Sequence, residues 1–451
     1  MRSAIVLAAG KGTRMKSTLC KVMHPVMNKP MIGHIIDRLK EAGVSRIIVV
    51  VGHGAESIKE YLQDSVEYAL QEPQLGTGHA VMQANMLKDL DGDTIVLCGD
   101  GPCIQTQTIQ KVFEANKEQA CTVVTAKLED GKSYGRIVRN DQGFVKKIVE
   151  AKDCSSEELA IKEINTGIYC FKNKVLFENL NEIKNENAQK EYYLTDMVEI
   201  LQSKGHVVNA MTVNDVDELM GVNDRLDLAK ANVWMKRHIN KMHMLNGVTI
   251  IDPEHTYIDV DVQIKEDTTI YPNVYIQGNT IIGSGVTILS NSFLKDAIIE
   301  DGVIIDSSKI VDSTVGERSS VGPMSHLRNH TVVGQDCRIG NFVELKNTNF
   351  GNGSKCAHLT YIGDSDVGKK VNFGCGVVTV NYDGKNKYRT VVKDGAFIGS
   401  NVNLIAPVTV GENTLLAAGS TITQSVKDGD MGIARSRQEI KKGYGTRYKN
   451  K

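Results

Sequence analysis

Between about Val262 and about Val426, apolar residues recur at every sixth position. Long runs keep the step and shorter runs fill the gaps: Ile264, Ile270, Ile276, Ile282, Ile288, Leu294; Val315, Val321, Leu327, Val333, Ile339, Leu345; Ile398, Leu404, Val410, Leu416, Ile422; Ile304, Ile310; Phe350, Cys356, Ile362; and Val367, Phe373, Thr379. Of these 25 positions, 11 are followed directly by glycine, whereas 41 glycines in 451 residues give about two by chance. The glycines are an independent sign of the same period.

A period of six suits neither an amphipathic helix nor an alternating strand, and it is typical of a parallel β-helix with hexapeptide repeats. Each hexad supplies a short strand and a corner: the apolar side chain points inward and the following glycine permits a sharp bend. Three hexads make one triangular coil, and coils must stack to bury their apolar faces. A β-sandwich of short alternating strands is the alternative. From Val380 to about Gly395 the pattern stops, which predicts a loop leaving one corner.

Residues 1 to about 220 instead alternate strand-like and helix-like segments. Strands are expected at Ala4–Ala8, Arg46–Val51 and Thr94–Cys98, and helices near Met31–Ala42, after Gly54 and after Gly76. This alternation predicts βαβ units and a Rossmann-like, mainly parallel sheet whose ligands bind beyond the carboxyl ends of the strands.

A long helix from about Asp224 to His243 separates the two patterns and ends near Asn246-Gly247. Its apolar residues are expected to pack on the sheet domain: Leu226, Leu228, Ala229, Val233, Trp234 and Ile239. We therefore expect an α/β sheet domain at 1–223, a rigid linker helix at 224–246, and a β-helix domain with a basic tail at 247–451.

Composition narrows the class of protein. The 53 basic residues nearly balance the 54 acidic ones, so no nucleic-acid or membrane partner is expected. The nine cysteines form no C-x-x-C pair, which predicts reduced thiols in a cytoplasmic protein. The apolar run Ala4–Ala9 is too short for a signal peptide or a membrane span.

Two groups of residues in the first half point to phosphate chemistry. The string Leu7-Ala8-Ala9-Gly10-Lys11-Gly12-Thr13-Arg14-Met15 follows the first strand, and its backbone N–H groups can approach phosphates closely. Arg14 and Lys21 lie near it in sequence and supply charge. Asp100 follows another buried strand, where its carboxylate is well placed to hold Mg²⁺, a cation that prefers oxygen ligands. Taken singly, a glycine-rich turn or an aspartate at such a place is often only structural.

The string L-A-A-G-x-G-T-R-M resembles the motif of sugar-nucleotidyltransferases. That resemblance implies catalytic roles for Arg14 and Lys21 and metal ligation by Asp100 and Asn223. It also implies a set of residues that bind UTP and the UDP-sugar: Leu7, Ala8, Ala9, Gly10, Lys21, Gln71, Gly76, Thr77, Gly135, Glu150, Asn165 and Asn223. Cys20, Cys98 and Gly101 depart from the usual family pattern.

The β-helix carries chemistry of its own around His358-Leu-Thr-Tyr361-Ile-Gly-Asp364 and the following loop Asn381-Tyr382-Asp383-Gly384. Histidine exchanges protons near neutral pH, so His358 can act as the general base that an amine nucleophile needs before attacking a thioester. Standing alone, it would usually be read as a surface histidine.

Together, the two motif sets resemble one bacterial family, the bifunctional N-acetylglucosamine-1-phosphate uridyltransferase/glucosamine-1-phosphate acetyltransferases, from Arg2 to about Arg437. The resemblance implies that the sugar phosphate of the acetyl site is held by Arg328, Lys346, Tyr361, Asn372 and Asn381-Tyr382. It implies that acetyl-CoA is contacted by Cys375, Asn381, Tyr382, Ser400, Ala418 and Arg435. The β-helices of this family are left-handed and associate as homotrimers.

The expected function is therefore acetyl transfer from acetyl-CoA to glucosamine 1-phosphate, followed by uridylyl transfer from UTP to N-acetylglucosamine 1-phosphate with Mg²⁺. One alternative is a single-activity sugar-1-phosphate nucleotidyltransferase whose β-helix only oligomerises or regulates. Another is a non-catalytic scaffold that keeps both folds. The presence of Arg14, Lys21, Asp100 and His358 argues against the scaffold.

Overall fold

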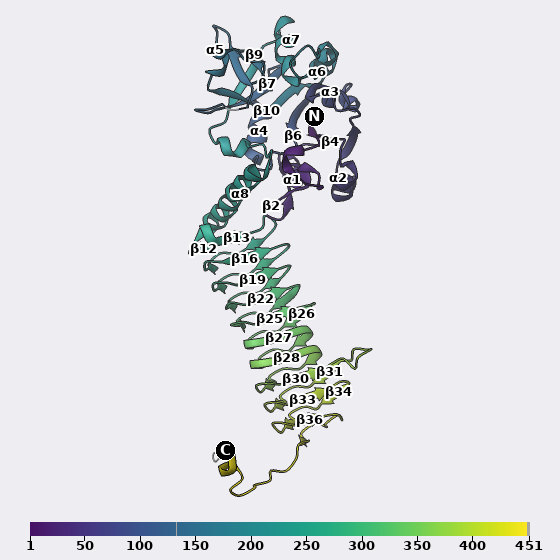
Figure 1. Cartoon of the computed structure of the whole chain (residues 1–451), viewed down its shortest axis with the longest axis vertical. Coiled ribbons are helices and arrows are strands. Elements are labelled where there is room, and N and C mark those ends of the chain that lie inside the picture. The colour runs from purple at the N-terminus through teal and green to yellow at the C-terminus, as the bar shows by residue number, and fades with distance from the viewer. Residues whose placement is uncertain (132, 449–451) are drawn as a thin grey trace. The chain divides into compact units, whose positions relative to one another are not determined.

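The computed structural model of the chain describes residues 1–131 and 133–448. The chain divides into two compact units, Met1–Met235 and Lys236–Lys451, and the division falls within helix α8 (Arg225–Leu245). Figure 1 labels the elements of both units. Among the described residues, no helix combines the length and the apolar character that crossing a bilayer requires.

The first unit is built on a mixed sheet whose main path runs in the order β11-β7-β10-β6-β1-β4-β5. These strands are β11 (Val208–Thr212), β7 (Cys121–Lys127), β10 (Glu163–Lys172), β6 (Asp93–Cys98), β1 (Arg2–Ala8), β4 (Arg46–Val51) and β5 (Glu67–Leu70). Neighbours pair in parallel except β10, which runs antiparallel to both β6 and β7. The prediction of a mainly parallel, Rossmann-like sheet is confirmed, and β10 is the antiparallel strand that the alternation did not reveal.

Both faces of this sheet are buried. Ala4 and Val6 of β1 enter one apolar cluster with residues of helices α1 (Met31–Glu41), α2 (Ala55–Leu62) and α4 (Thr106–Ala115). Ile5 between them enters the other cluster, with residues of α3 (Thr77–Met82), α6 (Asn173–Asn179) and α7 (Met197–Ser203). Alternate side chains thus face opposite helical layers, which explains why β1 and β4 read as unbroken apolar runs.

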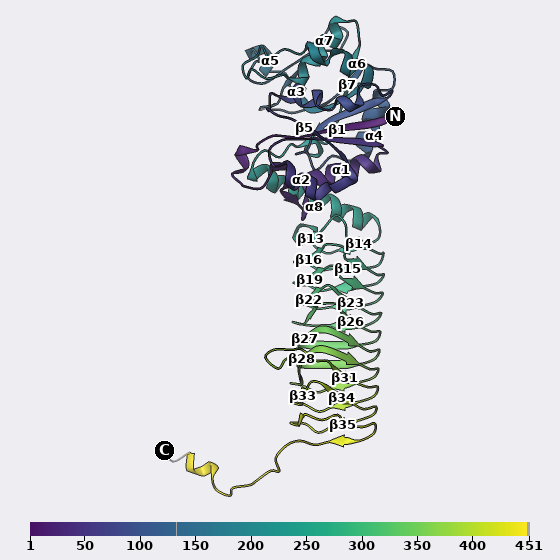
Figure 2. The same cartoon turned by 90° about the vertical axis from the view of Figure 1, so that its right-hand side faces the viewer.

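The second unit is a prism of stacked parallel strands from β12 (Thr249–Ile250) to β37 (Met431–Gly432). Each strand pairs mainly with the third strand along the chain, so three strands make one coil; Ile270 pairs with Ile288, and Leu404 with Ile422. Figure 2 shows these coils stacked within the unit. Most predicted hexad positions, including Ile276, are buried. The predicted β-helix is confirmed, and the β-sandwich alternative is wrong.

In the short run Ile304 and Ile310, the first position is wrong and the second, fully buried, is confirmed. Ile304 is exposed, at 49%, while Ile305 is fully buried. The reason is a step of five residues, not six, between the inward positions Ile305 and Ile310: Ile288 pairs with Ile305, 17 positions later, whereas Leu294 pairs with Ile310, 16 positions later. Counting back six positions from Ile310 therefore gives Ile304, one residue before the position that is buried.

The predicted loop is present but shorter than expected. Strand β30 (Val378–Val380) ends where the hexads stop, and β31 (Thr390–Val392) resumes the prism before Gly395. Tyr388 N–H donates to Asn381 O at 2.9 Å, which closes the base of the loop. The loop projects from the prism beside β31 (Figure 1).

The predicted apolar face of α8 is mostly wrong. Leu226 and Val233 are exposed, at 74% and 43%, whereas Ala231, Met235 and Ile239 are buried. The buried residues are spaced by four and form one stripe along the helix. Within the second unit, Asn240 Nδ2 donates to Pro253 O at 2.8 Å and to Thr256 O at 3.0 Å, so polar groups also fasten this helix.

Candidate active sites

The phosphate loop of the first unit begins where β1 ends and continues into a single turn at Thr13–Met15. Gly12 has φ +59°, and a Cβ there would lie 2.6 Å from Lys21 Cβ. Only glycine therefore allows both this left-handed turn and the close approach of the lysine stem. The loop geometry brings Lys21 to the carboxyl ends of β1 and β6.

Lys21 reaches the two side chains that were predicted to hold a metal. Its ammonium donates to Asp100 Oδ2 in a short ion pair and to Asn223 Oδ1 at 3.1 Å. Arg14 donates to the same Asn223 oxygen at 2.9 Å. The cationic side chains of Lys21 and Arg14 therefore share the oxygens of Asp100 and Asn223. These four residues form one cation cluster, although Arg14 and Asn223 are 209 positions apart in the sequence.

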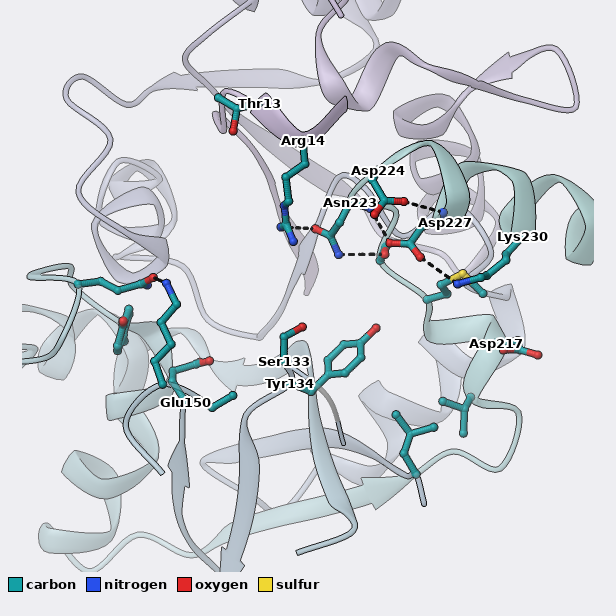
Figure 3. Close-up of a pocket in the computed structure, with 18 residues that line it drawn as sticks. Thr13, Arg14, Ser133, Tyr134, Glu150, Asp217, Asn223, Asp224, Asp227 and Lys230 are labelled. Carbon is teal, nitrogen blue, oxygen red and sulfur yellow. Dashed lines mark hydrogen bonds and ion pairs between the residues drawn. The ribbon is translucent and has the colours of Figure 1, made fainter. Parts of the chain in front are cut away.

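Two cavities open at this cluster. The smaller, of about 270 Å³, is lined by Lys21 and Asp100, and the larger, of about 1100 Å³, by Arg14 and Asn223. Figure 3 shows the larger one, with Arg14 and Asn223 on one side and Tyr134 and Glu150 on another. The cation cluster is thus accessible from both cavities.

Most predicted residues of the first unit line one of these cavities. Those of the smaller cavity are Leu7, Ala8, Ala9, Gly10, Lys21, Gln71, Gly76, Thr77 and Asp100; those of the larger are Arg14, Glu150 and Asn223. Gly135 and Asn165 line neither: Asn165 N–H donates to Gly135 O at 2.9 Å, and Asn165 Nδ2 donates to Tyr169 Oη at 2.6 Å. Their binding roles stay predictions.

The sequence analysis missed Gln74 and Glu191 of the smaller cavity, and it named Cys98, which also lines this cavity, without giving it a role. Glu191 comes from a loop without any motif. Burial raises the pKa of the Cys98 thiol to about 12, so this side chain stays protonated and contributes an apolar wall. In the larger cavity, burial and the nearby Asp153 and Asp196 raise the pKa of Glu150.

In the second unit, four of the six predicted coenzyme residues stack on one corner of the prism. Asn401 N–H donates to Cys375 O at 2.7 Å, and Gly419 N–H donates to Ser400 O at 2.8 Å. Arg435 Nη1 continues the column by donating to Ala418 O at 2.7 Å. Cys375, Ser400, Ala418 and Arg435 therefore follow one another on successive coils.

His358 belongs to the same corner column, because Gly376 N–H donates to Leu359 O at 3.1 Å. Its side chain is exposed, and Nδ1 lies 2.7 Å from Asn341 Oδ1, one coil earlier. An amide oxygen only accepts, so Nδ1 carries the proton in this contact and Nε2 is left with its lone pair. In the neutral ring, Nε2 is therefore the atom that is able to accept a proton.

The predicted sugar-phosphate residues lie on β25 (His326–Arg328), β27 (Arg338–Phe350), β28 (Lys355–Val367) and β29 (Asn372–Phe373). Arg328 pairs with Glu344 at 2.6 Å. Tyr361 lies beside Glu344 in the strand register. Asn372 pairs in register with Lys355 of β28.

Asp364 is a residue that the sequence analysis quoted without a role. It is only 5% exposed, and its carboxylate accepts from Asn347 Nδ2 at 2.6 Å, from Asn381 Nδ2 in a short hydrogen bond, and from Lys346 Nζ at 3.5 Å. Burial raises its pKa, but these hydrogen bonds and the Lys346 charge outweigh it and hold the pKa below its usual value. One buried carboxylate thus fixes Lys346 and the base of the Asn381 loop.

The two units and their sites define a nucleotidyltransferase joined to a hexapeptide-repeat transferase. Residues 3–235 match the family model described as nucleotidyl transferase. Residues 253–350 match the GMPPB C-terminal domain, and residues 389–424 match the bacterial transferase hexapeptide (six repeats).

Curated relatives match the whole chain, and each is named "Bifunctional protein GlmU". The relative from Exiguobacterium sibiricum is 52% identical over 444 residues, 98% of this chain and 99% of its own. The one from Halalkalibacterium halodurans is 52% identical over 452 residues, 100% and 99%, and one from Clostridium botulinum is 50% identical over 445 residues, 98% and 97%. The chain belongs to this family of bifunctional GlmU proteins. The predicted family is confirmed, and the single-activity alternative is set aside.

The Asp364 network yields a prediction about stability and pH. A carboxylate whose folded pKa lies below the unfolded value of about 3.9 stabilises the fold above that value, and the contribution is lost as the pH falls through the folded pKa. Asp364→Asn should therefore lower the melting temperature of the second unit at pH 7, and the difference from wild type should shrink below about pH 3. Melting curves across this range test it; a difference that does not change with pH would contradict the assigned charge.

Proposed function

We propose that the chain makes UDP-N-acetylglucosamine in two steps on two separate sites. The second unit transfers the acetyl group of acetyl-CoA to glucosamine 1-phosphate, and the first unit then joins N-acetylglucosamine 1-phosphate to the uridylyl group of UTP. The observation that carries the proposal is the full-length match to bifunctional relatives together with one polar, solvent-accessible site in each unit.

In the first unit, the smaller cavity is proposed to take the nucleoside triphosphate and the larger one the sugar phosphate. A phosphate oxygen of the sugar attacks the α-phosphorus in line and pyrophosphate leaves, so no protein base is needed. The backbone N–H groups around Gly10 hold phosphate oxygens, while Arg14 and Lys21 offset the charge that develops on the transferred group. Gln71 is proposed to face the uracil from the wall of the smaller cavity.

Asp100 and Asn223 are proposed to hold Mg²⁺. The donor set fits, because a carboxylate and an amide oxygen suit a hard cation that completes its shell with water and phosphate. A second sign is that both oxygens already attract cationic side chains, Lys21 and Arg14. When bound, the ion would supply positive charge at the phosphates.

In the second unit, His358 Nε2 is proposed to accept a proton from the glucosamine amine as the amine attacks the thioester carbonyl. Asn341 keeps the proton on Nδ1 and so keeps Nε2 basic. The tetrahedral intermediate then collapses, the C–S bond breaks, and coenzyme A leaves as the thiol. Backbone N–H groups of the same corner are placed to stabilise the oxyanion.

The remaining predicted residues divide between the two substrates of this unit. Arg328 and Lys346 are proposed to bind the phosphate, with Tyr361 and Asn372 on the sugar. Cys375, Asn381, Tyr382, Ser400, Ala418 and Arg435 are proposed to contact acetyl-CoA. The stacking of four of these on one corner column supports an extended ligand lying along successive coils.

We further propose a homotrimer of left-handed prisms in the cytoplasm. On the outer face of the prism, the residues that follow Asn372 in strand register on the next three coils are apolar. They are Phe397, Leu415 and Met431, which are exposed at 49%, 41% and 58%. A row of this kind is more usual at a contact between subunits than on a free surface.

Single substitutions should separate the two activities. His358→Ala should abolish acetyl transfer, measured as thiol release, and leave pyrophosphate release from UTP and N-acetylglucosamine 1-phosphate within about threefold; Asp100→Ala should do the reverse, each loss being at least about a hundredfold. Omitting glucosamine 1-phosphate, acetyl-CoA or UTP in turn from the wild-type assay is the control. Loss of both activities in either variant would contradict independent sites.

The Lys21 contacts predict competition for the metal site. Lys21→Met removes the ammonium that occupies Asp100 and Asn223, so Mn²⁺ affinity without nucleotide should rise roughly tenfold, while uridylyl transfer falls. Titration of free Mn²⁺ by electron paramagnetic resonance measures this. Lys16→Met removes an equal charge from the same loop without a contact to Asp100 and serves as the matched control. An affinity that is unchanged or weaker in Lys21→Met would contradict the competition.

A further inference from the structure

Gln71 stands at the wall of the smaller cavity, directly after β5. The residue is only 3% exposed, so its amide has little freedom to exchange partners with water. A buried primary amide can present either its carbonyl oxygen or its NH₂ group to a ligand, and the two faces select opposite chemistry. The residues that fix the orientation of the Gln71 amide therefore determine whether the cavity offers a hydrogen-bond donor or an acceptor to a base.

Two neighbours use the NH₂ group of Gln71. Its Nε2 donates to Gly76 O at 3.0 Å and lies 3.1 Å from His79 Nδ1. Gly76 O is a carbonyl and can only accept, so the nitrogen must face it, whichever tautomer the histidine adopts. With one hydrogen on Gly76 O and the other directed at His79 Nδ1, the NH₂ group has none left for a ligand.

Gly76 itself is held in place by the segment around Tyr192. Gly78 N–H donates to Tyr192 O at 2.7 Å, and Tyr192 N–H donates to Leu75 O at 2.8 Å. Gly76 has φ +108°, and a Cβ there would lie 2.7 Å from Tyr192 O. The acceptor opposite Gln71 is therefore positioned by packing that another residue type would disrupt.

His79 supplies the second anchor through the lone pair of Nδ1. Gln83 Nε2 also lies near the ring, 3.3 Å from His79 Nε2, and it donates to the His79 carbonyl at 2.9 Å. A neutral imidazole has one ring lone pair, and the shorter contact, to Gln71, takes it. The ring proton then resides on Nε2.

The carbonyl oxygen Oε1 of Gln71 is the group that stays free. It has no hydrogen-bond partner among the described residues, and Gln71 lines the cavity. An oxygen at this place accepts from a ring N–H, which uracil carries at N3. Cytosine presents a lone pair at N3, so it would face the Gln71 oxygen with a second acceptor.

We propose that His79 is a positioning residue for base selection: it holds the Gln71 amide so that the cavity accepts a pyrimidine with N3–H and rejects one without it. The proposal deepens the proposed uridylyl transfer and rests on it. His79 does not touch the base, and thymine, which also carries N3–H, would not be distinguished by this contact.

A matched pair of substitutions tests the role. Asparagine can place an oxygen where His79 Nδ1 stands, whereas leucine has nearly the same shape and no acceptor. We expect the ratio of kcat/KM for UTP to that for CTP to fall roughly tenfold in His79→Leu, mainly through a higher KM for UTP, and to stay within about threefold of wild type in His79→Asn. Melting temperatures of both variants check folding, and His79→Phe repeats the leucine test with a ring in place.

The outcomes are distinguishable. Wild-type protein that does not release pyrophosphate from UTP would sink the proposed function and this inference with it. Wild-type protein that uses UTP, with equal UTP/CTP ratios in His79→Asn and His79→Leu, would overturn the inference alone. A loss confined to the leucine and phenylalanine variants supports it, because a merely structural role would affect UTP and CTP alike.

Discussion

The main-chain hydrogen bonds between successive coils are the constraint on which the second unit depends. Successive coils exchange main-chain hydrogen bonds at equivalent positions, so residues spaced by three hexads stack into columns. His358 and four of the residues proposed to bind the coenzyme share one corner column, although up to 77 positions separate them. The buried apolar core supplies the stability, and the repeat fixes the places of the outward side chains.

In the first unit, the main constraint is that charged side chains from distant parts of the chain meet at one edge of the sheet. Parallel strands bring Asp100 and the phosphate loop to the same edge of the sheet, and Asn223 arrives just before α8. Lys21 and Arg14 donate to the oxygens of Asp100 and Asn223 there. If nucleotide and Mg²⁺ bind as proposed, these contacts are the ones that must be redistributed.

Much of the architecture could be predicted from the sequence because its patterns are regular. The hexads predicted the prism, and they failed at Ile304, because the inward positions Ile305 and Ile310 are five residues apart and no local signal marks the shorter step. The apolar face of α8 was misjudged because the helix also uses polar anchors such as Asn240. Strand β10 runs antiparallel, and alternation of segments does not encode direction.

Candidate site residues could be predicted where they belong to a sequence motif. They could not be predicted where only the folded structure brings them next to another site residue. Asn341, Asp364 and His79 contact His358, Lys346 and Gln71, respectively, and those pairs become visible only when chain segments stack. His358 and Asn341 are 17 positions apart, one coil, so knowledge of the coil length could have suggested that pair. Glu191 lies in a loop without any pattern and had no such clue.

The central claim is that the repeat aligns one extended substrate with one base. A crystal structure of the full-length protein with acetyl-CoA tests it most directly. The account predicts that the coenzyme lies along the corner column through Cys375, Ser400 and Ala418 toward Arg435, with its thioester beside His358 Nε2. A coenzyme bound on another face of the prism, or with its thioester away from His358, would contradict the account.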